Sequence, residues 1–176
     1  MPDTPAWYVL TGGPSAGKTT LINALSERGY RTVSEAARDF IEEEIAKGKT
    51  YAEVRKDEAA FQRALVERKI AMEKALSREK LTFFDRGIPD STAYYELIGL
   101  PIDSELRAAL AAASYRKAFL LGLIPFEKDD IRKETQEDAI TLNRLLRKSY
   151  EELGVRVVDV SVMPIQDRAD FILANL

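Results

Sequence analysis

The chain of 176 residues contains no cysteine and no histidine. The lack of cysteine excludes disulfides and thiolate chemistry, as is usual for proteins of the cytoplasm. The lack of histidine excludes an imidazole base, a phosphohistidine intermediate and a histidine-ligated zinc site. Any acid–base chemistry must therefore come from carboxylates, lysine or tyrosine.

Long apolar runs and an excess of charge are also missing. No run approaches the roughly 20 residues that cross a bilayer, and residues 1–5 lack the basic and apolar regions of a secretory signal. The net charge of −3 gives no reason to expect nucleic-acid binding, which usually needs a basic face. We therefore expect one domain over residues 1–176, located in the cytoplasm, without membrane insertion and without a nucleic-acid partner.

The most informative stretch is a glycine-containing turn between an apolar run and a helical segment. Gly12, Gly17, Lys18 and Thr19 fit the Gly-x4-Gly-Lys-Ser/Thr pattern of the P-loop. In such loops backbone N–H groups and a helix N-terminus bind phosphates. The lysine binds the β- and γ-phosphates, and the threonine hydroxyl is a ligand for Mg²⁺. We therefore predict that MgATP binds to Gly12, Gly13, Pro14, Ser15, Ala16, Gly17, Lys18, Thr19 and Thr20.

Strand and helix patterns alternate along the chain. Strands are expected at residues 7–12, 30–33, 81–85, 117–124 and 155–160. Helices are expected at residues 17–28, 35–47, 57–79, 90–98, 103–114, 135–153 and 166–174, with a connector at 48–56. This alternation predicts an α/β fold with a five-stranded parallel sheet between two helical layers. The P-loop would then lie at the carboxyl end of the first strand, where such sheets bind ligands.

Asp85 and Arg86 end the buried strand at 81–85. A carboxylate in this place can hold the water shell of Mg²⁺, as the Walker B aspartate does; the alternative is that Asp85 only caps the following turn. Arg86 can reach a phosphate with its planar guanidinium, or it can form a salt bridge at the rim of the sheet.

Glu35 follows the second strand and is expected at the same edge of the sheet as Asp85. Without histidine, Glu35 or Asp85 is the natural general base. The alternative is a helix-start glutamate that is favoured by the helix dipole. Arg38 lies one turn further on and can pair with Glu35 or touch a substrate phosphate.

A charged loop at about 126–134 follows the fourth strand and contains Arg132. Arginine-bearing lids close over the transferred phosphoryl group in many kinases, and we expect Arg132 to act in this way. The alternative is a solvated loop in which nearby acidic residues neutralise the cations. Tyr94, Tyr95 and Tyr115 are expected in the core or stacked on a ligand ring, and Arg168 lies where a purine can rest.

These motifs together resemble a known family. It is the small P-loop domain, classified among the AAA domains, that includes the ribosylnicotinamide-kinase half of the bacterial regulator NadR and many bacterial ATPases. The resemblance lies in residues 10–20 (LTGGPSAGKTT), 35–38 (EAAR), 84–90 (FDRGIPD), 131–134 (IRKE) and 155–170. It implies a nucleoside- or nucleotide-kinase-like sheet of order 2-3-1-4-5, with Mg-nucleotide at the P-loop. It also implies a second site facing Glu35, Asp85 and Arg86, and a lid that carries Arg132.

The family does not fix the substrate, because its members do different things. We expect an ATP-dependent phosphotransferase that acts on a small hydroxyl-bearing metabolite, such as a nucleoside or a ribosyl compound. Lys18, Asp85, Glu35, Arg86 and Arg132 would form its catalytic set. The alternative is a slow ATPase that acts as a nucleotide-dependent switch and binds a protein or lipid-headgroup partner. The guanine-selective Asn-Lys-x-Asp sequence is missing from its expected place, which favours ATP over GTP.

Overall fold

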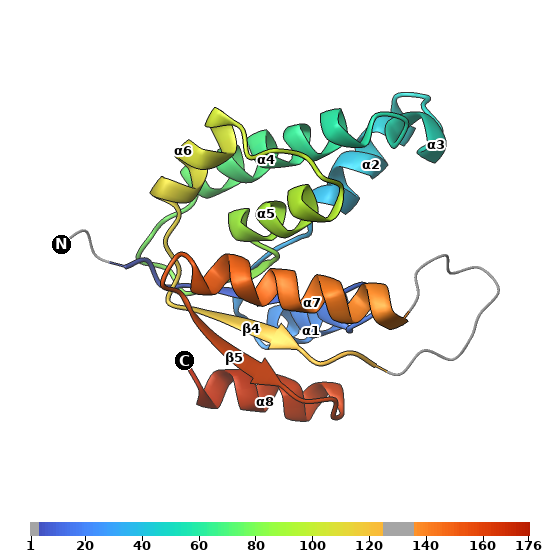
Figure 1. Ribbon diagram of the computed structural model, residues 1–176. Coiled ribbons are helices and arrows are strands. Elements are labelled where there is room, and N and C mark those ends of the chain that lie inside the picture. Colours follow the sequence, from blue (N-terminus) through green and yellow to red (C-terminus); the bar gives the residue numbers. More distant parts are fainter. Residues whose placement is uncertain (1–3, 125–135) are drawn as a thin grey trace.

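A five-stranded sheet lies at the centre of the computed structural model, which describes residues 4–124 and 136–176 (Figure 1). Its strands are β1 (Trp7–Thr11), β2 (Arg31–Val33), β3 (Thr82–Asp85), β4 (Lys117–Leu121) and β5 (Arg156–Val160). They are parallel and lie in the order β2-β3-β1-β4-β5. The prediction of a parallel sheet of order 2-3-1-4-5 is confirmed. The register places Leu10 of β1 beside Asp85 of β3, so this carboxylate lies next to the loop that follows β1.

Helices cover both faces of the sheet. On one face α1 (Lys18–Glu27) packs against α8 (Ile165–Ala174). On the other, α7 (Gln136–Glu151) lies on β4 and β5, and α5 (Ile88–Leu97) packs against it. Outside α5 lie α4 (Glu58–Lys74) and α6 (Ser104–Ala112) (Figure 1). None of the helices in the described residues is long and apolar enough to span a membrane.

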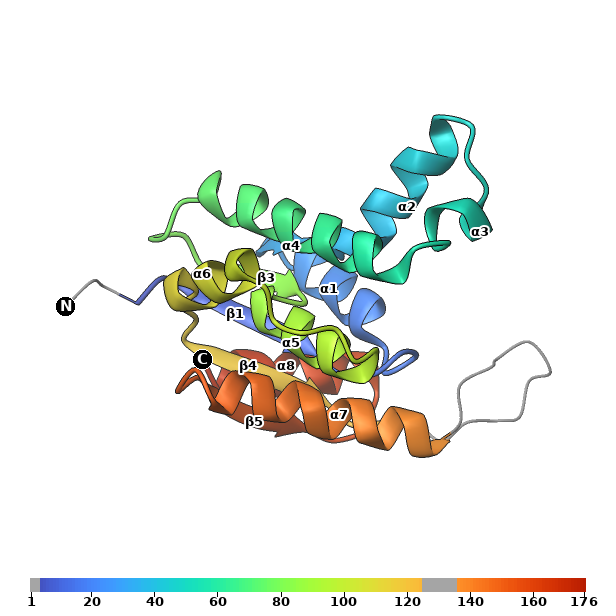
Figure 2. The ribbon, with the colours of Figure 1, turned by 45° about the horizontal axis from the view of Figure 1, so that its top comes forward.

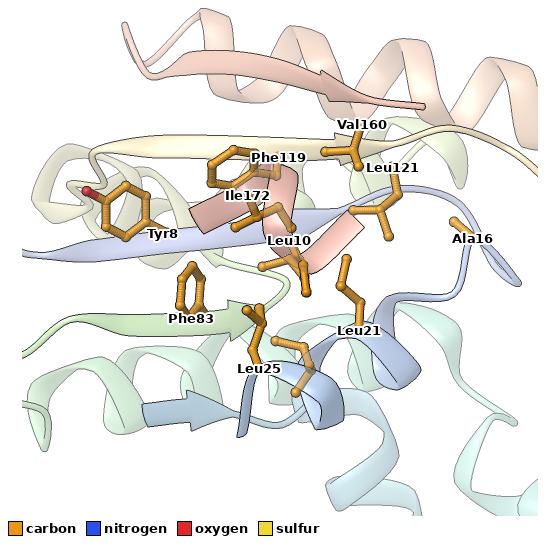
Figure 3. Packing of buried hydrophobic residues seen from close by; sticks show 12 residues of the cluster. Tyr8, Leu10, Ala16, Leu21, Leu25, Phe83, Phe119, Leu121, Val160 and Ile172 are labelled. Carbon is orange, nitrogen blue, oxygen red and sulfur yellow. The ribbon is translucent and has the colours of Figure 1, made fainter. Parts of the chain in front are cut away.

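Side chains alternate between the two faces of the central strand, as expected for an extended chain. Tyr8 and Leu10 point into the core under α1 and α8, together with Phe83 and Phe119 from the neighbouring strands (Figure 3). Trp7 and Val9 point into the core on the opposite face. Because β1 is buried on both faces, its sequence is a continuous apolar run.

The connector expected at 48–56 contains a short helix, α3 (Tyr51–Val54). Thr50 and Glu53 form a capping box, in which the Thr50 N–H donates to Glu53 Oε2 at 2.7 Å and the Thr50 hydroxyl accepts from the Glu53 N–H. This single turn follows α2 (Ala36–Ala46), and both project beyond the end of α4 (Figure 2).

Several predicted boundaries are wrong, and three of these errors have a clear physical reason. The helix expected to reach residue 79 ends at Lys74, because the chain turns so that the Ser77 carbonyl accepts the Trp7 indole N–H at 3.1 Å. The strand expected to reach residue 124 ends at Leu121, where its partner β5 also ends. The helix expected from residue 90 begins at Ile88, because Pro89 fits the first helical turn. The predicted lid at 126–134, with Arg132, lies outside the described residues.

Candidate active site

The P-loop makes a tight turn between β1 and α1. Gly12, Ser15 and Gly17 have φ values of 143°, 61° and 84°, in the region that favours glycine. A Cβ atom at Gly12 would lie 3.1 Å from the Leu121 carbonyl oxygen. Gly17 precedes α1 and no side chain caps this helix. The first N–H groups of α1 are therefore available to an anion.

Lys18 lies over this loop. Its ammonium donates to the carbonyl oxygens of Gly12 and Gly13 at 3.0 and 2.8 Å. Burial, and then the nearby charge of Arg86, lower the pKa of Lys18 to about 7. A phosphate beside Lys18 would favour the charged form of the ammonium.

Two side chains from late in the chain hold the loop in place. The Gly13 N–H donates to Asn143 Oδ1 at 2.7 Å, and the Asn143 amide donates to the Leu121 carbonyl. The Arg168 guanidinium is buried and donates to the Ala16 and Ser161 carbonyl oxygens at 2.7 and 3.1 Å. Arg168 thus supports the P-loop from within the protein, in place of the predicted contact with a purine.

Thr19 and Asp85 lie together, as the predicted magnesium site requires. The Thr19 hydroxyl donates to Asp85 Oδ2 at 3.4 Å. Burial, and then the nearby charge of Glu35, raise the pKa of Asp85 to about 6. Within the described residues Asp85 Oδ1 is buried and has no hydrogen-bond partner. A hydroxyl and a carboxylate with a free oxygen fit Mg²⁺, which is usually held by one or two carboxylates and several waters. No cluster of three or more acidic side chains in the described chain offers a different metal site.

Arg86 is held in a turn by residues distant in sequence. Its φ is 68°, and its N–H donates to the Leu10 carbonyl. The guanidinium contacts Glu35 at 3.0 Å and Asp90 at 3.4 Å, and it lies 5.2 Å from the Tyr94 ring centre. The predicted salt bridge of Arg86 is present, and Arg86 lines the wall of the site. Its predicted contact with a phosphate stays a prediction. Glu35 pairs with Arg86, and Arg38 does not take part in this pair.

Asp90 is the centre of the network that fixes this turn. It is fully buried and accepts hydrogen bonds from Thr11 Oγ1 at 2.6 Å, from the Gly87 N–H at 2.9 Å and from the Tyr150 hydroxyl.

A second chain of hydrogen bonds holds the residue after Gly87. The Ile88 N–H donates to the Tyr115 hydroxyl at 3.1 Å, and the Tyr115 hydroxyl donates to the Glu73 carboxylate. Of these side chains, the sequence linked only Asp90 to the turn, because it lies in the same short motif as Arg86. Tyr95 and Tyr115 are buried in the core.

A cavity of about 500 Å³ joins these parts. One half is formed by the P-loop and the start of α1. The other half is formed by the start of α2, by one side of α4 and by the Arg86 turn. The residues lining it are Pro14, Ser15, Gly17, Lys18, Thr19, Thr20, Glu35, Ala36, Ala37, Arg38, Arg55, Phe61, Gln62, Leu65, Lys69, Arg86 and Tyr94. The structure therefore brings most of the predicted P-loop residues together with Glu35 and Arg86, and it adds a wall from α4 that no sequence motif indicated.

A parallel sheet of this order, with a Gly-x4-Gly-Lys-Thr loop at the end of its central strand, defines a P-loop domain with the fold of nucleoside and nucleotide kinases. The chain belongs to the AAA domain family, which matches residues 7–168. No curated protein sequence matches the chain.

Solved structures share the fold at low sequence identity. Thymidylate kinase from Ehrlichia chaffeensis matches with a TM-score of 0.64 and 14% identity, over 98% of each chain. Deoxyadenosine kinase from M. mycoides matches with a TM-score of 0.62 and 15% identity, over 96% of this chain and 97% of that one. NadR in complex with NR matches with a TM-score of 0.68 and 18% identity; the match covers 96% of this chain and 49% of NadR, so the chain spans about half of that protein.

Proposed function

We propose that this protein is an ATP-dependent phosphotransferase that acts on a small acceptor, such as a nucleoside or a ribosyl compound. The observation that carries the proposal is the single cavity of about 500 Å³ that joins the P-loop to Glu35 and Arg86. It provides adjoining places for a nucleotide and for a second small molecule. The similarity of fold to thymidylate kinase and deoxyadenosine kinase supports this assignment.

On the nucleotide side, each group has a defined role. The first N–H groups of α1 and the Lys18 ammonium bind the β- and γ-phosphates. Thr19 and Asp85 hold Mg²⁺, which neutralises phosphate charge when it is bound. Lys18 releases its hydrogen bonds to the Gly12 and Gly13 carbonyl oxygens to reach the phosphates.

On the acceptor side, an oxygen of the acceptor attacks the γ-phosphorus. The bond from that phosphorus to the β,γ-bridging oxygen breaks, and ADP leaves with the electron pair. For a hydroxyl acceptor, the proton passes to Glu35 or Asp85, whose carboxylates lie at this edge of the sheet. Arg86, held against Glu35 and Asp90, stabilises the charge on the transferred group. Arg132 is proposed to do the same from the lid.

The test measures ADP formation from MgATP with a panel of nucleosides, nicotinamide riboside, sugars, inositol compounds and their phosphate esters. Lys18→Ala is the blank, and we expect it to lower the rate by about 10²–10³-fold or more. A rate that rises many-fold with one acceptor class, with the phosphorylated product found by mass spectrometry, supports the proposal. A slow rate that no acceptor changes, and that Lys18→Ala abolishes, contradicts it and indicates the nucleotide-dependent switch.

A further inference from the structure

The half of the cavity away from the P-loop is strongly basic. Its charged residues are Glu35, Arg38, Arg55, Lys69 and Arg86. Two of the four cations are neutralised by the protein itself, since Arg86 pairs with Glu35 and Asp90, and Arg55 pairs with Glu58 at 2.7 Å. Arg38 and Lys69 form no ion pair with any residue in 4–124 or 136–176. This half of the cavity therefore holds two positive charges that no described carboxylate neutralises by contact.

Lys69 is the more informative of the two, because it is buried. Lys69 is only 8% exposed, and its ammonium donates to the Ser91 hydroxyl at 2.9 Å. An ammonium has three donors and no acceptor, and burying it beside a neutral partner is unfavourable. Burial, and then the nearby charge of Arg86, lower the pKa of Lys69 to about 8, although the carboxylates of Asp90, Glu35 and Glu73 act in the opposite direction. An anion in the cavity would compensate this charge.

The start of α2 points to the same conclusion. Glu35 is the N-cap of this helix and its side chain makes no capping hydrogen bond. The first-turn residues Ala36, Ala37 and Arg38 line the cavity. Uncapped N–H groups at the start of a helix of 11 residues attract an anion. The helix start, Arg38 and the buried ammonium of Lys69 thus border one space, which we name the α2 anion subsite.

We infer that the acceptor carries a phosphate monoester and that the α2 anion subsite binds this phosphate. The inference rests on the proposed function and sharpens it, because a neutral nucleoside or sugar would leave the Lys69 ammonium without an anion in contact. A phosphate monoester carries a charge of about −1.5 to −2 near pH 7, which matches the two cations. The P-loop, on the opposite side of the cavity, remains available for the triphosphate.

The first experiment compares matched acceptors in the ADP assay: adenosine with AMP, uridine with UMP, ribose with ribose 5-phosphate, and inositol with inositol phosphate. We expect the phosphate ester of the best pair to give a kcat/KM about 10- to 100-fold above that of its parent, the range of a charge-assisted contact. A parent compound that matches or exceeds its ester in every active pair overturns the inference and leaves the phosphotransferase intact.

Lys69→Met tests the subsite directly, since methionine keeps most of the volume of the side chain and removes the charge. We expect the KM of the phosphorylated acceptor to rise about 10- to 100-fold, with the KM of ATP unchanged, and Lys69→Arg to recover part of the loss. Because the charge is unfavourable in the protein alone, Lys69→Met should melt at or above the wild-type temperature. Lys74→Met removes an exposed charge from the same helix and is the matched control. Unchanged acceptor KM in Lys69→Met overturns the inference.

A second experiment does not depend on turnover. Inorganic phosphate is the probe, and melting temperature is measured in Lys18→Ala, which weakens phosphate binding at the P-loop. A phosphate-dependent rise in Lys18→Ala that disappears in Lys18→Ala/Lys69→Met supports the subsite, even where no acceptor is phosphorylated and the proposed function alone fails. An equal rise in both proteins overturns the subsite.

Discussion

Two turns leave neighbouring strands of the sheet, and they are held in different ways. The P-loop leaves β1, and the turn at Arg86 leaves β3. Each contains a residue other than glycine at positive φ, Ser15 at 61° and Arg86 at 68°, and each leads into a helix of the site. The P-loop is shaped largely by its own sequence, through its glycines and through the Lys18 contacts with Gly12 and Gly13.

The Arg86 turn depends on distant residues instead. Its partners come from β1, from the start of α2 and from α7, at separations of 51 to 79 positions: Thr11, Glu35 and Tyr150. The backbone shape of the P-loop is thus encoded largely in its own glycines, with Asn143 and Arg168 as distant supports. The hydrogen bonds that hold the Arg86 turn come mainly from residues distant in the chain. Substitutions in the network of the Arg86 turn should therefore affect folding stability more than substitutions at the exposed tip of the P-loop.

The largest effect is expected at Asp90. In Asp90→Ala, the buried donors of Thr11, Gly87 and Arg86 lose their acceptor, and we expect the free energy of unfolding to fall by about 3–5 kcal/mol. Chemical denaturation measures this loss. Asp170→Ala, which breaks an exposed pair with Arg28, is the control and should cost less than about 1 kcal/mol. Equal losses of unfolding free energy in Asp90→Ala and Asp170→Ala would show that the buried network does not stabilise the Arg86 turn.

A smaller effect, visible only as a pH dependence, is expected at Glu73. Burial raises the pKa of Glu73 from 4.5 to about 7, against the hydrogen bond from Tyr115. Between these values the folded state holds a proton that the unfolded state has released, so this group lowers stability as the pH rises from 4.5 to 7. The contribution is at most about 3 kcal/mol. Glu73→Gln should flatten the plot of unfolding free energy against pH in this window, and parallel plots for the two proteins would show that burial does not perturb Glu73.

Tyr150→Phe removes one hydroxyl from the same network. The Asp90 carboxylate loses a donor, and the Gly87 N–H loses an acceptor at 3.2 Å. We expect a loss of about 1–2 kcal/mol in denaturation. Tyr30→Phe is the control, because the Tyr30 hydroxyl has no hydrogen bond among the described residues although its ring packs on Phe83. A neutral Tyr150→Phe would mean that the Arg86 turn holds without its α7 partner.

The smallest effect is expected in the P-loop itself. Ser15 is exposed and has a left-handed conformation, which costs a residue other than glycine about 1–2 kcal/mol. Replacing Ser15 by glycine would remove this cost, but part of the gain in stability would be lost, because glycine makes the unfolded chain more flexible. Ser15→Gly should therefore stabilise the protein by about 0.5–1 kcal/mol, measured by denaturation. Ser26→Gly in α1 should do the opposite, since glycine is unfavourable inside a helix; destabilisation by both would show that Ser15 is not strained.

The sequence predicted the elements well where the signal is local. The five strands follow from short apolar runs such as residues 81–85, and the helices follow from caps and periodic apolar residues. Predicted ends were less accurate. The helix before β3 was placed too long, because its end is set by the contact of Ser77 with Trp7, 70 positions away in the chain.

For the site, the sequence identified the P-loop residues, Glu35, Asp85 and Arg86, because each lies at the carboxyl end of a strand. It missed Gln62 and Lys69 in the α4 wall, Asn143 behind Gly13, and Tyr150 beneath the Arg86 turn. These residues lie within helices, where a polar side chain gives no sign of the element that it faces.

The sequence by itself determined that a parallel α/β sheet carries a phosphate-binding loop, because glycine spacing and apolar periodicity act over a few neighbouring residues. Only the tertiary structure decided what faces that loop. The pairing of Glu35 with Arg86, the burial of Lys69 and the support of Asp90 by Tyr150 depend on how α2, α4 and α7 pack around the sheet. That packing joins residues far apart in the chain, and it forms the half of the cavity that faces the P-loop.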